Sequence, residues 1–178
     1  MNADAKKLAT EALYDLAIRA LGRRSYTSAE LERKLRARAA RAESVDTVLK
    51  RLTDHGYLDD ARVAESHSHY RREYDSLGRR RVLGELRRRG IERETAEKIV
   101  NETYAETDEL ELIRNFLRRK LGSRIDEIRI DDRKQLGRLY RSLARAGFST
   151  QKIIEALGNL SSDSEWLEAM STVDELGE

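Results

Sequence analysis

Basic side chains recur at helical spacing in two segments of this chain, residues 78–89 and 132–146. On a helix that turns by about 100° per residue, the basic side chains opposite the apolar ones share one face. Guanidinium groups on such a face bind phosphates or carboxylates through paired hydrogen bonds, so the partner would be a nucleic-acid backbone or an acidic protein surface. The predicted partner-binding or DNA-binding residues are Arg80, Arg81, Gly84, Arg87, Arg88, Lys134, Arg138, Arg141 and Arg145.

Gly84 falls in the middle of the basic face of residues 78–89, at about 200° from the apolar side. A glycine inside an exposed helix costs about 1 kcal/mol relative to alanine. Close approach of a partner's backbone is one reason to retain it. The alternative is that the whole face is simply solvated and is held by pairs four residues apart, such as Glu85–Arg89.

No group of residues indicates catalysis or metal binding. His67 and His69 are two residues apart, so on a helix their side chains diverge by about 200° and cannot share a metal ion. His55 lies near Asp59 and Asp60, but these two acids are better explained as helix N-caps. The chain has no glycine-rich phosphate loop and no Ser/His/Asp set with a local signature. We therefore predict no enzyme, no catalytic residue, no metal and no cofactor.

The basic segments occupy equivalent places in a threefold repeat. Aligning the chain with itself at offsets of 51 and 57 residues superimposes three leucines and, four residues later, three small residues. Further apolar residues follow at the same spacing in each copy. The aligned positions are Leu35, Leu86 and Leu143, then Ala39, Gly90 and Gly147. Repeats of this kind bury apolar faces against their neighbours and bind partners over extended surfaces.

The apolar spacing predicts three helices in each repeat, and therefore an all-α, elongated array of three tandem three-helix repeats. The first repeat, with an N-terminal extension, covers residues 1–60, the second 61–106 and the third 107–160, followed by an acidic tail at 161–178. Helices are predicted near residues 8–22, 44–54, 59–75, 78–89, 92–105, 108–121, 132–146 and 149–158, with one more beginning at Thr27.

Three helices are predicted to end at a glycine that is followed by an apolar residue. This pattern is typical of a Schellman motif, in which the glycine is left-handed and the next residue folds back on the last turn. The pairs are Gly56-Tyr57, Gly90-Ile91 and Gly147-Phe148, and with Asp59 and Asp60 they are assigned structural roles. Replacing Gly56 is expected to lower stability and to leave specific activity unchanged.

Several helix starts and the position of the first helix are also predicted from local spacing. Thr27 with Glu30 and Asp132 with Gln135 have the spacing of a capping box, and Ser149 is a candidate N-cap. The first helix, near residues 8–22, is predicted from apolar residues four apart. They are Leu8, Ala12, Leu16 and Ala20.

The composition limits the class of protein. The 178 residues include no proline and no cysteine, and 38% are charged. Helices with one solvated face fit this composition, and neither disulfides nor a thiolate site can form. No apolar run approaches the roughly 18 residues of a membrane span, and the first residues do not resemble a signal peptide. We expect a cytoplasmic protein, a monomer, with no membrane partner.

Charge is distributed unevenly along the chain. Residues 159–178 contain six acids and no Lys or Arg; since the whole chain carries +2, the first 158 residues carry +8. A basic body would attract a polyanion while an acidic tail limits unspecific binding, or the charges simply keep the protein soluble. Trp166 and Leu167 in this tail would pack as a short terminal helix or dock on the body or on a partner.

The order of several short segments resembles the RecX family of recombinase regulators. The most specific string is Gly56-Tyr57-Leu58-Asp59-Asp60-Ala61-Arg62; Ser28-Ala29-Glu30-Leu31 and Lys34-Leu35 precede it, and Tyr70-Arg71-Arg72 and residues 78–91 follow. The resemblance covers residues 12–160 and is strongest in the first two repeats. Val63 stands where the family more often has an aromatic residue.

The resemblance implies a non-enzymatic protein of tandem three-helix repeats whose partner is the RecA recombinase filament. Members of the family inhibit ATP hydrolysis and strand exchange in homologous recombination and DNA repair, and some bind single- or double-stranded DNA. The residues themselves leave a second function open, a sequence-nonspecific DNA-binding protein. Each pair of second and third helices has the size of a helix-turn-helix, and the basic faces would contact phosphates.

Overall fold

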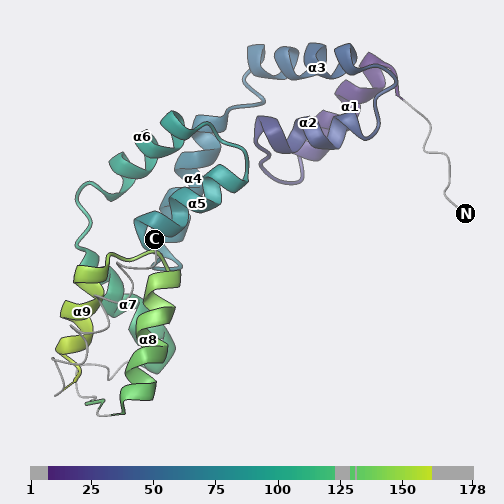
Figure 1. Cartoon of the computed structure of the whole chain (residues 1–178). Helices are drawn as coiled ribbons and strands as arrows, with labels where there is room; N and C mark the ends of the chain where they lie inside the picture. The colour runs from purple at the N-terminus through teal and green to yellow at the C-terminus, as the bar shows by residue number, and fades with distance from the viewer. Residues whose placement is uncertain (1–7, 123–128, 131, 162–178) are drawn as a thin grey trace, which may run out of the picture. The chain divides into compact units, whose positions relative to one another are not determined.

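The computed structural model describes residues 8–122, 129–130 and 132–161 of the chain. These residues form nine helices, and their only β pairing is an isolated bridge between Leu8 and Ala39 (Figure 1). The predicted all-α fold is confirmed, and most predicted helix ends lie within two residues of the observed ones. The helices are α1 (Thr10–Leu21), α2 (Ser28–Arg36), α3 (Ala42–Asp54), α4 (Asp60–Glu73), α5 (Arg79–Arg88), α6 (Arg93–Tyr104), α7 (Glu109–Leu121), α8 (Arg133–Arg145) and α9 (Thr150–Gly158).

The chain forms two compact units. The first contains the described residues up to His67 together with Glu85–Ile99, and the second contains Ser68–Gly84 and the described residues from Val100 onward. The two units divide residues 61–106 between them, so the predicted limits of the three repeats stay a prediction.

Helices α1, α2 and α3 build the core of the first unit around fully buried Leu31, Leu35 and Leu52. The four apolar residues whose spacing predicts α1 do not all lie on its buried face. The buried residues are Leu13, Ala17 and Ala20; Ala12 is exposed, Leu16 is only partly buried, and Leu8 precedes the helix. Apolar residues cover more than one side of α1, and a spacing of four does not select the side that meets α3.

The start of α2 is fixed by the predicted capping box. The Thr27 hydroxyl accepts from the Glu30 N–H at 3.1 Å, and the Glu30 carboxylate accepts from the Thr27 N–H at 3.2 Å. Asp59 also acts as predicted, accepting from the Arg62 N–H in the first turn of α4. Asp60 does not cap its own helix; its carboxylate accepts from the N–H and the hydroxyl of Ser28, at the start of α2.

Helices α7, α8 and α9 build the core of the second unit. Leu136, Tyr140 and Leu143 of α8 are buried in it, and Phe148 packs edge-on against Phe116 with ring centroids 5.8 Å apart. Asp132 precedes α8 and accepts from the Lys134 N–H.

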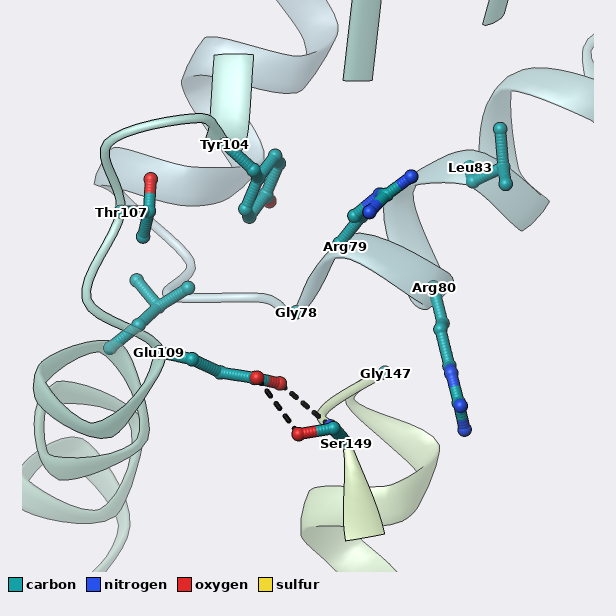
Figure 2. Close-up of a pocket in the computed structure, with 10 residues that line it drawn as sticks. Gly78, Arg79, Arg80, Leu83, Tyr104, Thr107, Glu109, Gly147 and Ser149 are labelled. Atoms are coloured by element: carbon teal, nitrogen blue, oxygen red, sulfur yellow. Dashed lines mark hydrogen bonds between the residues drawn. The ribbon is translucent and has the colours of Figure 1, made fainter. Parts of the chain in front are cut away.

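Ser149 stands at the N-cap position of α9, but its side chain makes no cap hydrogen bond there. Instead the hydroxyl donates to the carboxylate of Glu109, which also accepts the Ser149 N–H (Figure 2). The N-cap residue of α9 is thus bound by Glu109, the first residue of α7, which lies 40 residues earlier in the chain.

The three predicted glycine stops are left-handed, with φ of +70° at Gly56, +87° at Gly90 and +89° at Gly147. In each motif the N–H of the next residue donates to a carbonyl five residues earlier, as a Schellman motif requires. Ile91 and Phe148 are buried as expected, whereas Tyr57 is 55% exposed. The apolar half of the motif is therefore missing at the first stop.

The turn between the second and third helices of each repeat offers a carbonyl at an equivalent position. Each of the three carbonyls accepts one hydrogen bond from a segment earlier in the chain. The bonds are Leu8 N–H to Arg38 at 2.8 Å, the Thr27 hydroxyl to Arg89 at 2.7 Å, and Gly78 N–H to Ala146 at 2.8 Å. The first two lie in the first unit and the third lies in the second unit. A recurring backbone contact thus anchors each of these turns.

Candidate partner-binding surface

Helix α8 separates its basic and apolar side chains as the sequence predicts. Its four predicted binding residues are all exposed, while Leu136, Leu139 and Leu143 on the other side are buried. The side chains of these four make no salt bridge or hydrogen bond to another of the residues that the structure describes. We call these four, Lys134, Arg138, Arg141 and Arg145, the α8 basic face.

Helix α5 contributes the other predicted residues, divided between the two units. In the second unit Arg80 and Arg81 are exposed, and in the first unit Arg87 and Arg88 are exposed. Gly84 is half-buried, and a Cβ atom placed on it would meet nothing within 4 Å. The chain's own packing therefore gives no reason for a glycine at this position.

Backbone hydrogen bonds connect the start of α5 to the end of α8. The Gly78 N–H donates to Ala146 at 2.8 Å, and the Arg80 N–H donates to Gly147 at 3.2 Å. The arginines in the first turn of α5 and Arg145 in the last turn of α8 therefore belong to backbone segments that are bonded to each other. This contact unites two groups of predicted binding residues that are about 60 positions apart in the sequence.

A half-open pocket of about 550 Å³ lies at this contact (Figure 2). Leu83, Leu112 and Tyr104 supply apolar lining, and the Tyr104 hydroxyl donates to the Leu77 carbonyl. Arg79 and Arg80 leave the first turn of α5 in different directions. Ser149 and Glu109 also line the pocket, where the Ser149 hydroxyl donates to the Glu109 carboxylate, so its walls combine apolar, guanidinium and carboxylate groups.

Arg89 does not lie on a solvated helix face. Its guanidinium pairs with Glu30 at 2.9 Å, and Arg24 pairs with the same carboxylate at 3.2 Å. Burial tends to raise the pKa of Glu30, but hydrogen bonds from Arg89 and the Thr27 N–H, and the charge of Arg89, outweigh it and lower the pKa. Glu85 is buried and pairs with His67 at 2.9 Å. Both residues of the proposed Glu85–Arg89 pair thus make contacts within the first unit.

The sequence did not single out two exposed features of the second unit. Arg79 is exposed and lines the pocket, although it was not among the predicted binding residues. Tyr70 and Tyr74 are 53% and 65% exposed, with ring centroids 5.1 Å apart, and Arg119 donates to the Tyr74 carbonyl. The spacing of four between the tyrosines was the available signal. Aromatic residues at that spacing usually face a core, so the spacing alone does not predict that these rings are exposed.

The histidines and acids among the described residues do not gather into a metal site. No three described His, Cys, Asp or Glu side chains are close enough to hold a metal ion. His67 pairs with Glu85, and His69 lies 4.0 Å from Glu73. No described helix is long and apolar enough to cross a membrane. Residues 162–178, with Trp166 and Leu167, lie outside the described residues.

Comparison with known proteins shows the family to which the three-helix units of this chain belong. The family model for the first three-helix domain of RecX matches residues 14–52, and the model for the second matches residues 59–99. The regulatory protein RecX of Trichlorobacter lovleyi is 36% identical over 140 residues, which are 79% of this chain and 90% of that protein. The chain belongs to the RecX family.

Other RecX proteins match over a similar range. The regulatory protein RecX of Halorhodospira halophila is 33% identical over 159 residues, covering 88% of this chain and 93% of that protein. The crystal structure of RecX from Lactobacillus salivarius has a TM-score of 0.70 and 23% identity, and covers 85% of this chain and 96% of that one. The relatives are named as regulatory proteins, consistent with a RecX-type regulator.

Proposed function

We propose that this chain binds nucleoprotein filaments of the RecA recombinase and inhibits their ATP hydrolysis and strand exchange. It would act without chemistry of its own, as a monomer in the cytoplasm. Occupying a groove across neighbouring filament subunits would block the incoming duplex or the subunit motions that accompany ATP turnover.

The observation that carries the proposal is the α8 basic face in a member of the RecX family. Four cations lie on one face of a well-packed helix, and none is neutralised by a described side chain. Helix packing fixes their spacing before a partner arrives, so little ordering is needed on binding. A filament of RecA on DNA offers both phosphates and protein carboxylates to such a face.

The test is ATP hydrolysis by RecA on single-stranded DNA, with this protein added well below the RecA concentration. We expect loss of hydrolysis, and reversal of the α8 basic face to Glu should abolish it. The matched control reverses four exposed cations elsewhere, Arg19, Arg23, Lys50 and Lys98. Equal inhibition by both variants, each with a native helical spectrum, would remove the α8 basic face from the mechanism.

A second candidate function, binding of bare nucleic acid, is favoured by the exposed tyrosine pair. The rings of Tyr70 and Tyr74 contact each other, Arg119 donates to the Tyr74 carbonyl, and the last turn of α7 also carries Arg118 and Lys120. Aromatic rings next to cations are the usual platform for single-stranded nucleic acid, with about 1–3 kcal/mol per stacked base.

The stoichiometry of inhibition distinguishes the two functions. If hydrolysis falls only when the protein coats the DNA, competition for DNA explains the effect. In that case Tyr70→Ala with Tyr74→Ala should weaken binding to a thymidine 20-mer by at least about tenfold, and binding should fall steeply with salt. Tyr57→Ala, an equally exposed tyrosine in the first unit, is the matched control.

A further inference from the structure

The α8 basic face lacks counter-charges among the described residues. Its cations follow one another along about 17 Å of helix, from Lys134 to Arg145. A row of unpaired like charges repels itself and attracts any flexible acidic chain held nearby. No acidic segment among the described residues of the second unit pairs with these four cations.

Residues 162–178 have the composition that this face lacks. They contain six acids and neither Lys nor Arg. They also contain Trp166, the only tryptophan of the chain. The composition of this segment is thus opposite in charge to the α8 basic face.

The structure fixes the place where this segment begins. Leu160 is buried, and its carbonyl accepts from the Ile130 N–H at 2.8 Å. Arg129 donates to the Asn159 carbonyl at 3.2 Å. Since Ile130 is three residues before the first residue of α8, these bonds hold Ser161 close to the start of that helix.

The segment is long enough to reach every cation of the face. Seventeen residues span up to about 55 Å when extended, and α8 is about 20 Å long. A chain tethered at this range has an effective concentration on the order of millimolar. Weak electrostatic binding is therefore sufficient for substantial occupancy.

We propose that the acidic residues 162–178 of this chain occupy the α8 basic face and compete there with an anionic partner. The competition rests on the proposed function, because it is the partner-binding face that becomes covered. Regulation follows directly, because a partner must displace the segment before it can bind. The partner's apparent affinity is then its intrinsic affinity multiplied by the fraction of molecules whose α8 basic face is free. With half to nine-tenths of the face covered, neutralising the segment should tighten partner binding by about 2- to 10-fold.

Trp166 reports directly on the occupied state. Quenching of its fluorescence by acrylamide, a neutral molecule, measures how accessible the ring is. In the full chain the Stern–Volmer constant should rise at least about twofold when Lys134, Arg138, Arg141 and Arg145 are replaced by Gln. It should rise similarly in 1 M NaCl, where charges are screened beyond about 3 Å.

Replacing Arg19, Arg23, Lys50 and Lys98 by Gln removes the same charge from other exposed positions and should leave quenching unchanged. Circular dichroism establishes that both variants keep their helices. An unchanged Stern–Volmer constant in the folded α8 variant would overturn the proposal. So would an equal rise in the control variant, because general charge loss would then explain it.

Binding of a fluorescein-labelled thymidine 20-mer gives a second readout. Amides in place of the six acids Asp163, Glu165, Glu168, Asp174, Glu175 and Glu178 should tighten binding by the expected 2- to 10-fold. The control neutralises six exposed acids elsewhere, Glu43, Asp46, Asp54, Glu65, Glu92 and Glu94, and changes the net charge equally. Equal tightening in both variants counts against the proposal. If no variant binds DNA or RecA filaments, the proposed functions fail, and the Trp166 measurement still decides whether the face is covered.

Discussion

Two left-handed glycines allow the contact between α5 and α8 to be tested separately from backbone strain. Gly147 and Gly56 have φ of +89° and +70°, so alanine is strained at both positions. At Gly56 an added Cβ would meet nothing within 4 Å. At Gly147 it would overlap with the backbone nitrogen of Arg81 in the first turn of α5. Gly56→Ala is therefore a matched control for Gly147→Ala.

The expected loss of stability differs between the two substitutions. A left-handed conformation costs about 1–2 kcal/mol for a residue with a Cβ. At Gly147 the overlap with Arg81 adds about 1–3 kcal/mol, because a backbone atom cannot rotate away as a side chain does. The sums are about 1–2 kcal/mol for Gly56→Ala and about 2–5 kcal/mol for Gly147→Ala. At about 2–4 °C per kcal/mol, Gly147→Ala should melt several degrees below the control.

Urea titration followed by circular dichroism at 222 nm measures both losses. Inhibition of RecA at a temperature where both variants are folded then reports on the binding surface. Gly147→Ala should weaken inhibition because α5 and α8 must separate, whereas Gly56→Ala should not. Equal stability of the two variants, within about 0.5 kcal/mol, would refute the close approach of Gly147 to α5.

Three further predictions concern single contacts. Asp60→Ala should lower the free energy of unfolding by about 1–2 kcal/mol in a urea titration, because the N–H and hydroxyl of Ser28 lose their acceptor. Since the folded pKa of Glu30 is lowered below 4.5, its contribution to stability is complete above that pH and is lost as the pH falls through the folded pKa. Glu30→Gln should therefore flatten the fall in melting temperature on acidification, and an unaltered pH profile would contradict the pairing with Arg89. Gly84→Ala should raise stability by about 1 kcal/mol and weaken filament inhibition; unchanged inhibition would mean that no partner approaches this backbone closely.

The sequence predicted what depends on local spacing. The predicted core residues Leu35, Leu86 and Leu143 are all fully buried, and the three glycine stops have the expected conformation. The two basic helix faces are exposed as predicted. Each of these features is set within one or two helical turns, where periodicity and glycine chemistry act directly.

Contacts between distant segments were not predictable from the same spacing. Ser149 has the residue type and position of an N-cap, but Glu109, 40 residues away, takes both its N–H and its hydroxyl. Asp60 was expected to cap α4 and instead caps α2. Short polar side chains bond equally well to local and distant groups, so only the tertiary structure determines their partners.

The recurring carbonyl contact differs in chemistry between the aligned turns. Thr27 and Gly78 are equivalent in the repeat alignment and donate to the equivalent carbonyls of Arg89 and Ala146, one through a hydroxyl and the other through an N–H. A helix start packs closely against each of those two turns: Ala29 of α2 against Gly90, and Arg81 of α5 against Gly147. A Cβ atom on either glycine would overlap with that helix, so a glycine follows the carbonyl in both turns.

At the first turn the carbonyl of Arg38 receives the N–H of Leu8, and Ala39 lacks the positive φ of Gly90 and Gly147, so this position does not require a glycine. At the other end of the described array, the position equivalent to Thr27 and Gly78 is Gln135, which lies inside α8 because that helix begins about one turn earlier. On α8 the exposed face is the one that bears four cations, and the proposed function assigns the partner to this face.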